Sequence, residues 1–310
     1  MGEKGRSAVL RGRSCDPSQN SMSRSIQLVM ILSAPLALAI ALAVVGPRFF
    51  VSPRDLDYVV RFDMPAAGTP VDLPRVDGPA DSSRPLVVID AGHGGFDPGA
   101  GQGEVKEKAV ALRIALMLRN RLVEGGGVRV ALTRDTDRFI SLPDRPDMAR
   151  RLGADLFVSI HADSADSDSA RGASIYVLSE KGSSEAAERF AARENEAGRV
   201  NGVALSQTSQ SVGAILLDLS QRGTQAGSTQ AGELVLRELR AAGLGLHREQ
   251  VETAALAVLK APDIPSILFE TGYINNQGDA QVLTSRAGQQ ALADAAARAI
   301  RAYFARNGGG

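Results

Sequence analysis

The sequence predicts one α/β domain in which helices flank a mixed, largely parallel central sheet, with an inserted helical regulatory segment. Three observations lead to this fold class. Short apolar runs alternate with longer stretches of helical composition, as expected of strands joined by helices. The chain has 310 residues, of which 44% are hydrophobic, so a sizeable core can form. Polar side chains suited to ligand binding follow several apolar runs, and parallel sheets bind ligands at the carboxyl ends of their strands.

Residues 1–46 have the pattern of an export signal. A basic flank precedes the apolar run LVMILSAPLALAIALAVVG at residues 28–46. This run suits either a cleaved signal peptide or an uncleaved membrane anchor. The basic flank predicts that the N-terminus stays cytoplasmic and that the rest is exported to the periplasm, either free or anchored to the inner membrane. Residues 47–85 are rich in Pro, Asp and Arg, so we expect a linker.

The folded domain is expected at residues 86–306, followed by a flexible tail at residues 307–310. We predict strands at residues 86–90, 128–133, 156–161, 173–178 and 266–271. We predict helices at residues 106–123, 141–152, 248–259 and 286–306. Pro143 and Pro146 should confine the second helix to its later part, and Pro146 should distort its first turn, because proline donates no backbone hydrogen bond.

Charge and cysteine content exclude several classes of function. The chain has 35 Lys and Arg against 35 Asp and Glu, and no basic stripe stands out, so it lacks the features of a nucleic-acid-binding protein. Its single cysteine, Cys15, excludes an intrachain disulfide and a cysteine-based zinc site. Contact with a membrane is expected only through the N-terminal segment.

Four residues suited to metal binding or proton transfer lie at the ends of predicted elements. His93, His161 and Glu270 lie at or just after the ends of strands, and Glu107 lies at the start of the first helix. Two neutral imidazoles and one carboxylate can hold zinc and leave its fourth position open for water. Zinc lowers the pKa of such a water from about 15.7 to about 7. Glu270 is then the candidate that carries the proton from water to the leaving group.

Position alone leaves these roles open. A lone histidine is more often a surface or core residue than a ligand, Glu107 could simply favour the helix dipole, and Glu270 could be a hydrogen-bond acceptor. The third histidine, His247, would most simply start a helix. Asp90 and Asp97 are candidates to orient the histidines or to shape turns, because zinc-bound histidines usually donate their second N–H to an acceptor.

Several long motifs carry a resemblance to a known family. They are VVIDAGHGGFDPGA, the pair Glu107-Lys108, LTRDTDRFISL, DLFVSIHAD, RGASIYVLSEKG and VLKAPDIPSILFETGYINN, together with the closing helix. In this order and spacing, over most of residues 86–304, the sequence resembles the zinc-dependent N-acetylmuramoyl-L-alanine amidases of the type that separates daughter cells.

This resemblance implies that His93, Glu107 and His161 hold one zinc ion and that Glu270 is the catalytic carboxylate. It implies that the enzyme splits the septal wall by hydrolysing the amide bond between the lactyl group of N-acetylmuramic acid and the L-alanine of the peptidoglycan stem peptide. Two alternatives remain. One is a catalytically silent relative that binds the wall or recruits partners, and the other is a zinc peptidase that cuts within the stem peptide.

Residues 179–246 are interpreted as an insertion that the compact fold does not require. Some relatives look similar here and cover the zinc with an inserted helix, whose glutamate fills the open position. Glu194 is the best match for that glutamate and Glu196 the next. In such relatives a partner with a degenerate LytM-type domain withdraws the helix, so the resemblance implies an activator. A docking face for it, or else packing of the insertion onto the core, is expected of Ile215, Leu216, Leu217 and Leu219.

Overall fold

The computed structural model of the protein describes residues 72–165, 167, 169–196, 199–200, 203–204, 214–261 and 263–307. The expected export signal, most of the expected linker and residues 308–310 of the tail lie outside the described residues. So do the side chains of residues 214–222, which include Ile215, Leu216, Leu217 and Leu219. Within the described part of the chain, no helix is long and apolar enough to cross a membrane.

A seven-stranded sheet forms the centre of the described part, with the strand order β1-β5-β2-β6-β11-β7-β10. The strands are β1 (Val76–Asp77), β2 (Leu86–Ala91), β5 (Arg129–Leu132), β6 (Leu156–His161), β7 (Ser174–Leu178), β10 (Glu252–Ala254) and β11 (Ser266–Glu270). β1 runs antiparallel to β5, and β7 antiparallel to β11, whereas the other pairs are parallel. The prediction of a mixed, largely parallel sheet is confirmed.

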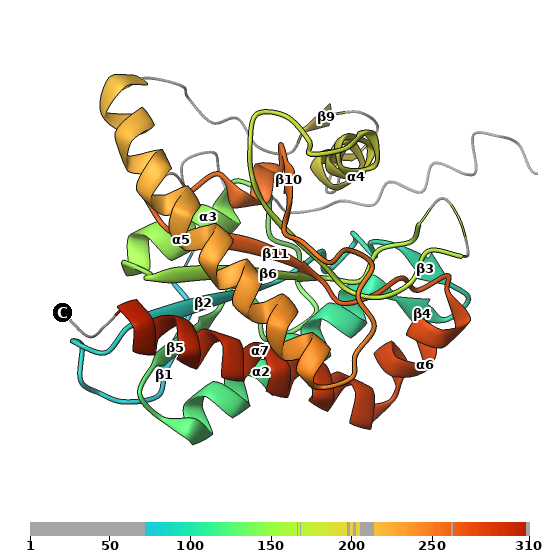
Figure 1. The fold of residues 1–310 in the computed structure, drawn as a ribbon, viewed down its shortest axis with the longest axis horizontal. Helices are drawn as coiled ribbons and strands as arrows, with labels where there is room; N and C mark the ends of the chain where they lie inside the picture. Colours follow the sequence, from blue (N-terminus) through green and yellow to red (C-terminus); the bar gives the residue numbers. More distant parts are fainter. Residues whose placement is uncertain are drawn as a thin grey trace, which may run out of the picture. The chain divides into compact units, whose positions relative to one another are not determined.

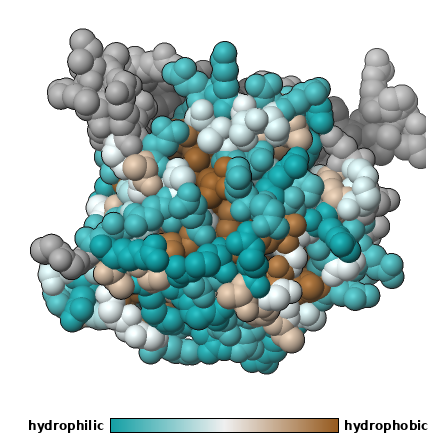
Figure 2. Space-filling view, in the orientation of Figure 1, coloured by the Kyte–Doolittle hydropathy of each residue, from teal (hydrophilic) through white to brown (hydrophobic). Residues whose placement is uncertain are grey.

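Helices cover both faces of this sheet (Figure 1). Alternate residues of a strand face opposite sides, so in β2 Val87 and Ile89 join one apolar cluster and Leu86 and Val88 the other. The first cluster packs against α2 (Glu107–Gly125), α5 (Ala214–Ala241) and α7 (Arg286–Asn307). The second packs against α3 (Asp144–Leu152), α4 (Glu185–Glu196) and the 3₁₀ helix η2 (Ala257–Leu259). The face drawn in Figure 2 is mostly hydrophilic, with hydrophobic residues in patches near its middle.

The helix predicted at residues 248–259 is wrong. The structure places the edge strand β10 there, followed by η2. β10 pairs in parallel with β7, with Thr253 opposite Val177. Pairing with an available strand edge outweighs a weak local helix pattern, and Thr253 is a residue type that suits strands. His247 therefore does not start a helix: its backbone N–H donates to the Ala173 carbonyl at 2.8 Å, and its ring meets Tyr273 edge-on at 5.1 Å.

The range 179–246 divides into two parts with different surroundings. α4 lies against β10 and η2 through Ala187, Phe190 and Ala191, which belong to the second apolar cluster. The later part of α5 belongs to the first cluster and packs along α7, with Leu234 and Leu239 buried. The portion of this range that lies outside the main core is therefore shorter than the sequence suggested.

Some elements were not predicted. They are β1, the hairpins β3 (Gly101–Gln102) with β4 (Val105–Lys106) and β8 (Arg199–Val200) with β9 (Val203–Ala204), and α6 (Gln277–Thr284). The α6 start carries a recognisable signal, because the Asn276 side chain accepts from two N–H groups of the first turn. α3 begins at Asp144, inside the predicted range 141–152 and after Pro143. Pro146 is its third residue, where the absent N–H would have no partner inside the helix.

Candidate metal centre

The candidate site lies at the carboxyl ends of three neighbouring strands. β2, β6 and β11 are adjacent in the sheet. His93 follows β2 by two residues, His161 is the last residue of β6, and Glu270 is the last residue of β11 and pairs with His161 in register. Glu107 is the first residue of α2. The sheet order thus brings together side chains that are far apart in the sequence, as expected for a parallel sheet.

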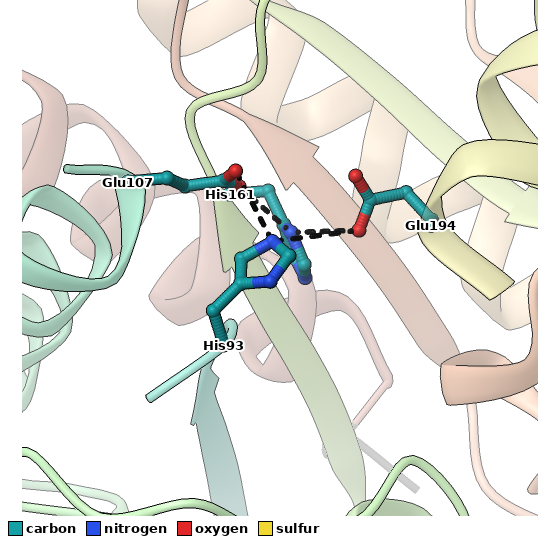
Figure 3. A group of neighbouring side chains, drawn as sticks. All are labelled: His93, Glu107, His161 and Glu194. Carbon is teal, nitrogen blue, oxygen red and sulfur yellow. Dashed lines mark hydrogen bonds and ion pairs between the residues drawn. The ribbon is translucent and has the colours of Figure 1, made fainter. Parts of the chain in front are cut away.

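Three predicted ligands converge with a fourth side chain into one buried group, His93, Glu107, His161 and Glu194, whose ligand atoms all lie within 4.8 Å of one another (Figure 3). Glu194 reaches this group from α4. Its Oε2 lies 3.1 Å from His161 Nδ1 and 3.7 Å from His93 Nε2. Glu196, the second candidate in the sequence, is exposed at the end of α4. The helix therefore presents Glu194 and not Glu196 to the site.

His93 is held in an unusual backbone conformation. Its φ is 56°, and it is the only non-glycine residue with positive φ in the described part of the chain. Such conformations are strained and tend to occur at functional sites. Its Nδ1 lies 2.9 Å from Asp97 Oδ2, which makes Asp97 the partner that fixes the ring, one of the two roles we expected for it. The opposite nitrogen, Nε2, then points into the group.

Glu107 is fixed through both oxygens. Oε2 accepts from the Ala100 N–H at 2.8 Å, and Oε1 accepts from the Ala162 N–H at 3.0 Å and lies 3.0 Å from His161 Nδ1. A carboxylate on the first turn of a helix is also favoured by the helix dipole. Each oxygen accepts only one backbone hydrogen bond and has a second lone pair, so Glu107 can hold a cation in place of a histidine proton without losing its backbone partners.

Two glycines make room for these ligands. A Cβ at Gly92 would lie 2.6 Å from His161 Nε2, and a Cβ at Gly99 would lie 2.6 Å from both Glu107 Oε2 and His93 Cδ2. Both distances are shorter than real Cβ contacts, so a larger residue would push a ligand side chain away. The glycine-rich turn after β2 therefore serves close packing around the site as well as chain reversal.

Two buried arginines hold the turn after β2, and sequence reasoning missed both. Arg134 donates to the carbonyls of Ala91 and Gly92 at 2.8 and 2.7 Å, and also to that of Lys108. Arg145 donates to the carbonyl of His93 at 2.9 Å. Arginine can satisfy several carbonyls at once because it offers five N–H donors in a rigid plane. Their presence in the motif around LTRDTDRFISL was visible in the sequence, but their partners were not.

Asp90 has a structural role and does not orient a histidine. It is fully buried and accepts from the hydroxyls of Thr133 and Ser159, at 2.7 Å each, and from Arg145 Nη1 at 2.8 Å. Burial alone would raise its pKa, but the Arg145 guanidinium and the two hydroxyls outweigh burial and lower the pKa. The charged Asp90 thus keeps Arg145 in the position that supports the His93 turn.

The charges of the group are strongly coupled in the metal-free protein. Burial opposes a charge on His93, yet the Glu107 and Asp97 carboxylates raise its pKa to about 10. Burial would also lower the pKa of His161, but Glu194 and Glu107 raise it well above the usual value. The histidines in turn lower the pKa of Glu107, against the effect of burial. Without a metal, protonated imidazoles balance the carboxylates; a divalent cation would replace those protons.

Glu270 lies beside the group but is not part of it. Its Oε2 accepts from the Asp163 N–H at 3.1 Å, and its Oε1 is buried without a hydrogen-bond partner among the described residues. Burial, together with the charges of Glu107 and other nearby carboxylates, raises its pKa well above the usual value. A carboxylate with a raised pKa and a free oxygen is a stronger base than an ordinary carboxylate and is placed to take up a proton.

The residues fit a zinc ion by the chemistry of their donor atoms. His93 Nε2 is buried and has no hydrogen-bond partner among the described residues, although it lies 3.1 Å from Glu107 Oε2. A buried nitrogen left without a hydrogen bond is unfavourable unless another ligand binds it. Two imidazoles with one or two carboxylates form a donor set typical of zinc. The group could therefore hold a metal ion at His93, Glu107 and His161, with Glu194 at a further position.

The folded part of the chain matches a known protein family. Residues 87–302 match the Amidase_3 family, described as N-acetylmuramoyl-L-alanine amidase. The chain is 41% identical over 230 residues to N-acetylmuramoyl-L-alanine amidase AmiC of Escherichia coli O6:H1 strain CFT073, which covers 74% of this chain and 55% of that protein. It is 39% identical over 221 residues to AmiA of Escherichia coli strain K12, covering 71% of this chain and 76% of that one.

Solved structures show the same fold. The chain aligns with N-acetylmuramoyl-L-alanine amidase AmiC2 of Nostoc punctiforme with a TM-score of 0.51 and 30% identity, over 72% of this chain and 98% of that one. It spans about half the length of the AmiC relatives that it matches. The matched residues contain β2 except for its first residue, every later strand to β11, and all four side chains of the buried group. The chain therefore belongs to the Amidase_3 family of N-acetylmuramoyl-L-alanine amidases.

Proposed function

We propose that this chain is a zinc-dependent N-acetylmuramoyl-L-alanine amidase that cleaves the amide bond between the lactyl group of N-acetylmuramic acid and the L-alanine of the peptidoglycan stem peptide. The observation that carries the proposal is the convergence of His93, Glu107 and His161, with a buried unpartnered Nε2 on His93, directly beside Glu270. The names of the relatives support the choice of substrate.

The roles of the residues follow from their positions. His93, Glu107 and His161 would hold the zinc, which supplies a water of lowered pKa and polarises the scissile carbonyl. Glu270 accepts the proton of the attacking water and returns it to the leaving amine. Its raised pKa makes Glu270 a stronger base than an ordinary carboxylate, which favours the uptake of the proton from water. Asp97 keeps the His93 ring in the orientation that presents Nε2.

The resting enzyme in this proposal is autoinhibited by Glu194. The Glu194 carboxylate lies within 3.1 Å of His161 Nδ1 and is buried in the group. A carboxylate there would take the coordination position that the attacking water needs, and α4 would exclude peptidoglycan from the site. Release of α4 would open that position to water and the site to peptidoglycan. Docking of a LytM-domain activator at Ile215, Leu216, Leu217 and Leu219 is part of the same proposal.

Three side chains of α4 bind it to the rest of the domain in the closed position. The Arg193 guanidinium donates to Asp163 Oδ2 at 2.6 Å. Asn195 donates to the Ala255 carbonyl and accepts from the Ala257 N–H, at 2.8 and 2.7 Å. The Phe190 ring also stacks on Tyr176, with centroids 4.5 Å apart. These contacts add to the apolar packing of Ala187, Phe190 and Ala191 in the second cluster. A partner that competes for them, and covers this apolar face, could release the helix and leave the first cluster intact.

The remaining parts of the proposal concern the cell. The protein is exported to the periplasm, either free or anchored by residues 28–46, and splits septal peptidoglycan during daughter-cell separation. The export signal in the sequence and the names of the AmiC and AmiA relatives support this. The retained Glu270 and the complete ligand set favour an active enzyme over a silent relative, because a binding protein needs neither.

Analysis of reaction products tests the activity. Purified peptidoglycan is incubated with the zinc-loaded chain, with Glu194→Ala and with Glu270→Ala, and soluble products are analysed by mass spectrometry. The proposal expects intact stem peptides with a free L-alanine amino group, more of them from Glu194→Ala and almost none from Glu270→Ala. Fragments cut inside the stem would establish a peptidase. No release from any zinc-loaded form would favour the silent relative.

A further inference from the structure

A small apolar recess adjoins the two histidines of the buried group. It is lined by His93 and His161 together with Phe139, Ile140, Leu142 and Val258, and by parts of Asp97 and Arg145. Phe139, Ile140 and Leu142 precede α3, and Val258 lies on η2. None of these described residues belongs to α4, so the recess does not depend on the closed position of that helix. An opened enzyme would still present it beside the metal ligands.

The recess suits an apolar occupant. Among the lining side chains, Asp97 and Arg145 already have partners: Asp97 binds His93 Nδ1 and the Gly99 N–H, and Arg145 binds Asp90 and nearby backbone carbonyls. His93 keeps one nitrogen, Nε2, without a hydrogen bond among the described residues. A bound water needs two or more free polar partners, which these side chains do not offer. Ile140 and Val258 are buried, so the walls are fixed by packing. The volume is about 10 Å³, roughly the room for a single water-sized group.

We infer that this recess receives one methyl group of the substrate next to the scissile bond and thereby selects the group that carries this methyl. The inference rests on the proposed amidase function. The scissile amide has a methyl on each flank, one on the lactyl carbon and one on L-alanine. A methyl group is close in size to the recess, whereas hydrogen leaves it empty and an ethyl group exceeds it.

Binding measurements test the inference apart from turnover. The full chain carrying Glu194→Ala and Glu270→Ala, loaded with zinc, is titrated calorimetrically with three muramoyl peptides: the parent, one with glycine in place of L-alanine, and one with a glycolyl in place of the lactyl group. The ligand that lacks the recess methyl should bind about 4-fold or more weakly, the value of one buried methyl. Nuclear Overhauser contacts from a substrate methyl to Leu142 and Val258 show whether the lactyl methyl or the L-alanine methyl occupies the recess.

Filling the recess provides the matched comparison. Leu142→Phe and Val258→Leu each place a larger side chain in the recess, from separate parts of the chain. In each variant the peptides with and without the methyl group should bind with about equal affinity. Leu116→Phe, a half-buried leucine of α2 outside the recess lining, should leave it unchanged. Equal binding of all three peptides, an absence of Overhauser contacts, or a preference that survives filling would overturn the inference. Release of stem peptides by the Glu194→Ala chain separately tests the amidase, so failure of the recess and failure of the function are distinguishable.

Discussion

Replacing Asn195 with alanine should activate the enzyme without touching the metal ligands. Asn195 lies in the last turn of α4, and its side chain binds the backbone of the segment between β10 and η2 through two hydrogen bonds. That segment packs on the core through Leu256 and Leu259, which are buried. The amide of Asn195 therefore links α4, the proposed lid over the site, to a part of the fold that stays in place when α4 moves.

The magnitude follows from the two lost bonds. A hydrogen bond contributes about 1 kcal/mol net, so loss of both shifts the closed–open equilibrium of α4 by roughly 2 kcal/mol. Because 1.4 kcal/mol is about tenfold, the open fraction should rise by roughly 30-fold while the closed form still predominates.

The assay is release of soluble stem peptides from peptidoglycan without an activator, together with the rate at which a chelator removes zinc. Both rates should rise in Asn195→Ala. Asn120→Ala is the matched control, because Asn120 is exposed on α2 and contacts only Arg119 by an identified bond. If Glu194→Ala raises basal release and Asn195→Ala does not, the proposed role of Asn195 in holding α4 closed is refuted, while autoinhibition by Glu194 stands.

Three further predictions concern the metal centre. Glu270→Ala should keep its zinc and lose roughly 10²–10⁴-fold in turnover, as expected for a general base; loss of the metal in native mass spectrometry would make Glu270 a ligand instead. Gly99→Ala should weaken zinc binding in equilibrium dialysis, because its Cβ would collide with Glu107, whereas Gly103→Ala, also at positive φ but with open space around it, should not. The metal-free protein should lose stability as pH rises: the contribution of charged His93 is complete below its ordinary pKa of 6.5 and is lost as pH approaches about 10. Thermal unfolding in chelator measures this, and a flat Tm over that range would contradict it.

Five strands of the central sheet and the positions of the three candidate ligands were predictable because their signals are local. Each of these five strands, β2, β5, β6, β7 and β11, is a short apolar run, and β6 has the predicted bounds. His93 and His161 follow such runs, and carboxyl ends of parallel neighbours must meet at one edge of a sheet. The place of Glu194 also had a readable signal. The buried residues of α4 are Ala187, Phe190, Ala191 and Glu194, an apolar stripe at helical spacing that ends in a carboxylate.

The edge strand β10 and the buried arginines were not predictable in the same way. The segment that holds β10 has too few residues for a clear period, and only the free edge of β7 decides its conformation. Arg134 and Arg145 look like ordinary surface charges in the sequence. Their burial is stable because their N–H groups donate to backbone carbonyls of the turn after β2. Arg134 Nε donates to Ala91 and Arg145 Nη2 to His93, each more than forty positions earlier in the sequence.

By itself, the sequence determined the α/β class, the strand ends that carry His93 and His161, and the carboxylate at the start of α2. These depend on local period and on residue chemistry, which the chain carries directly. Only the tertiary structure decided that the apolar face of α4, with Glu194, lies against the two histidines, that residues 252–254 form a strand, and that the recess beside the histidines is apolar. These features depend on packing between elements that are distant in the sequence, which no local pattern specifies.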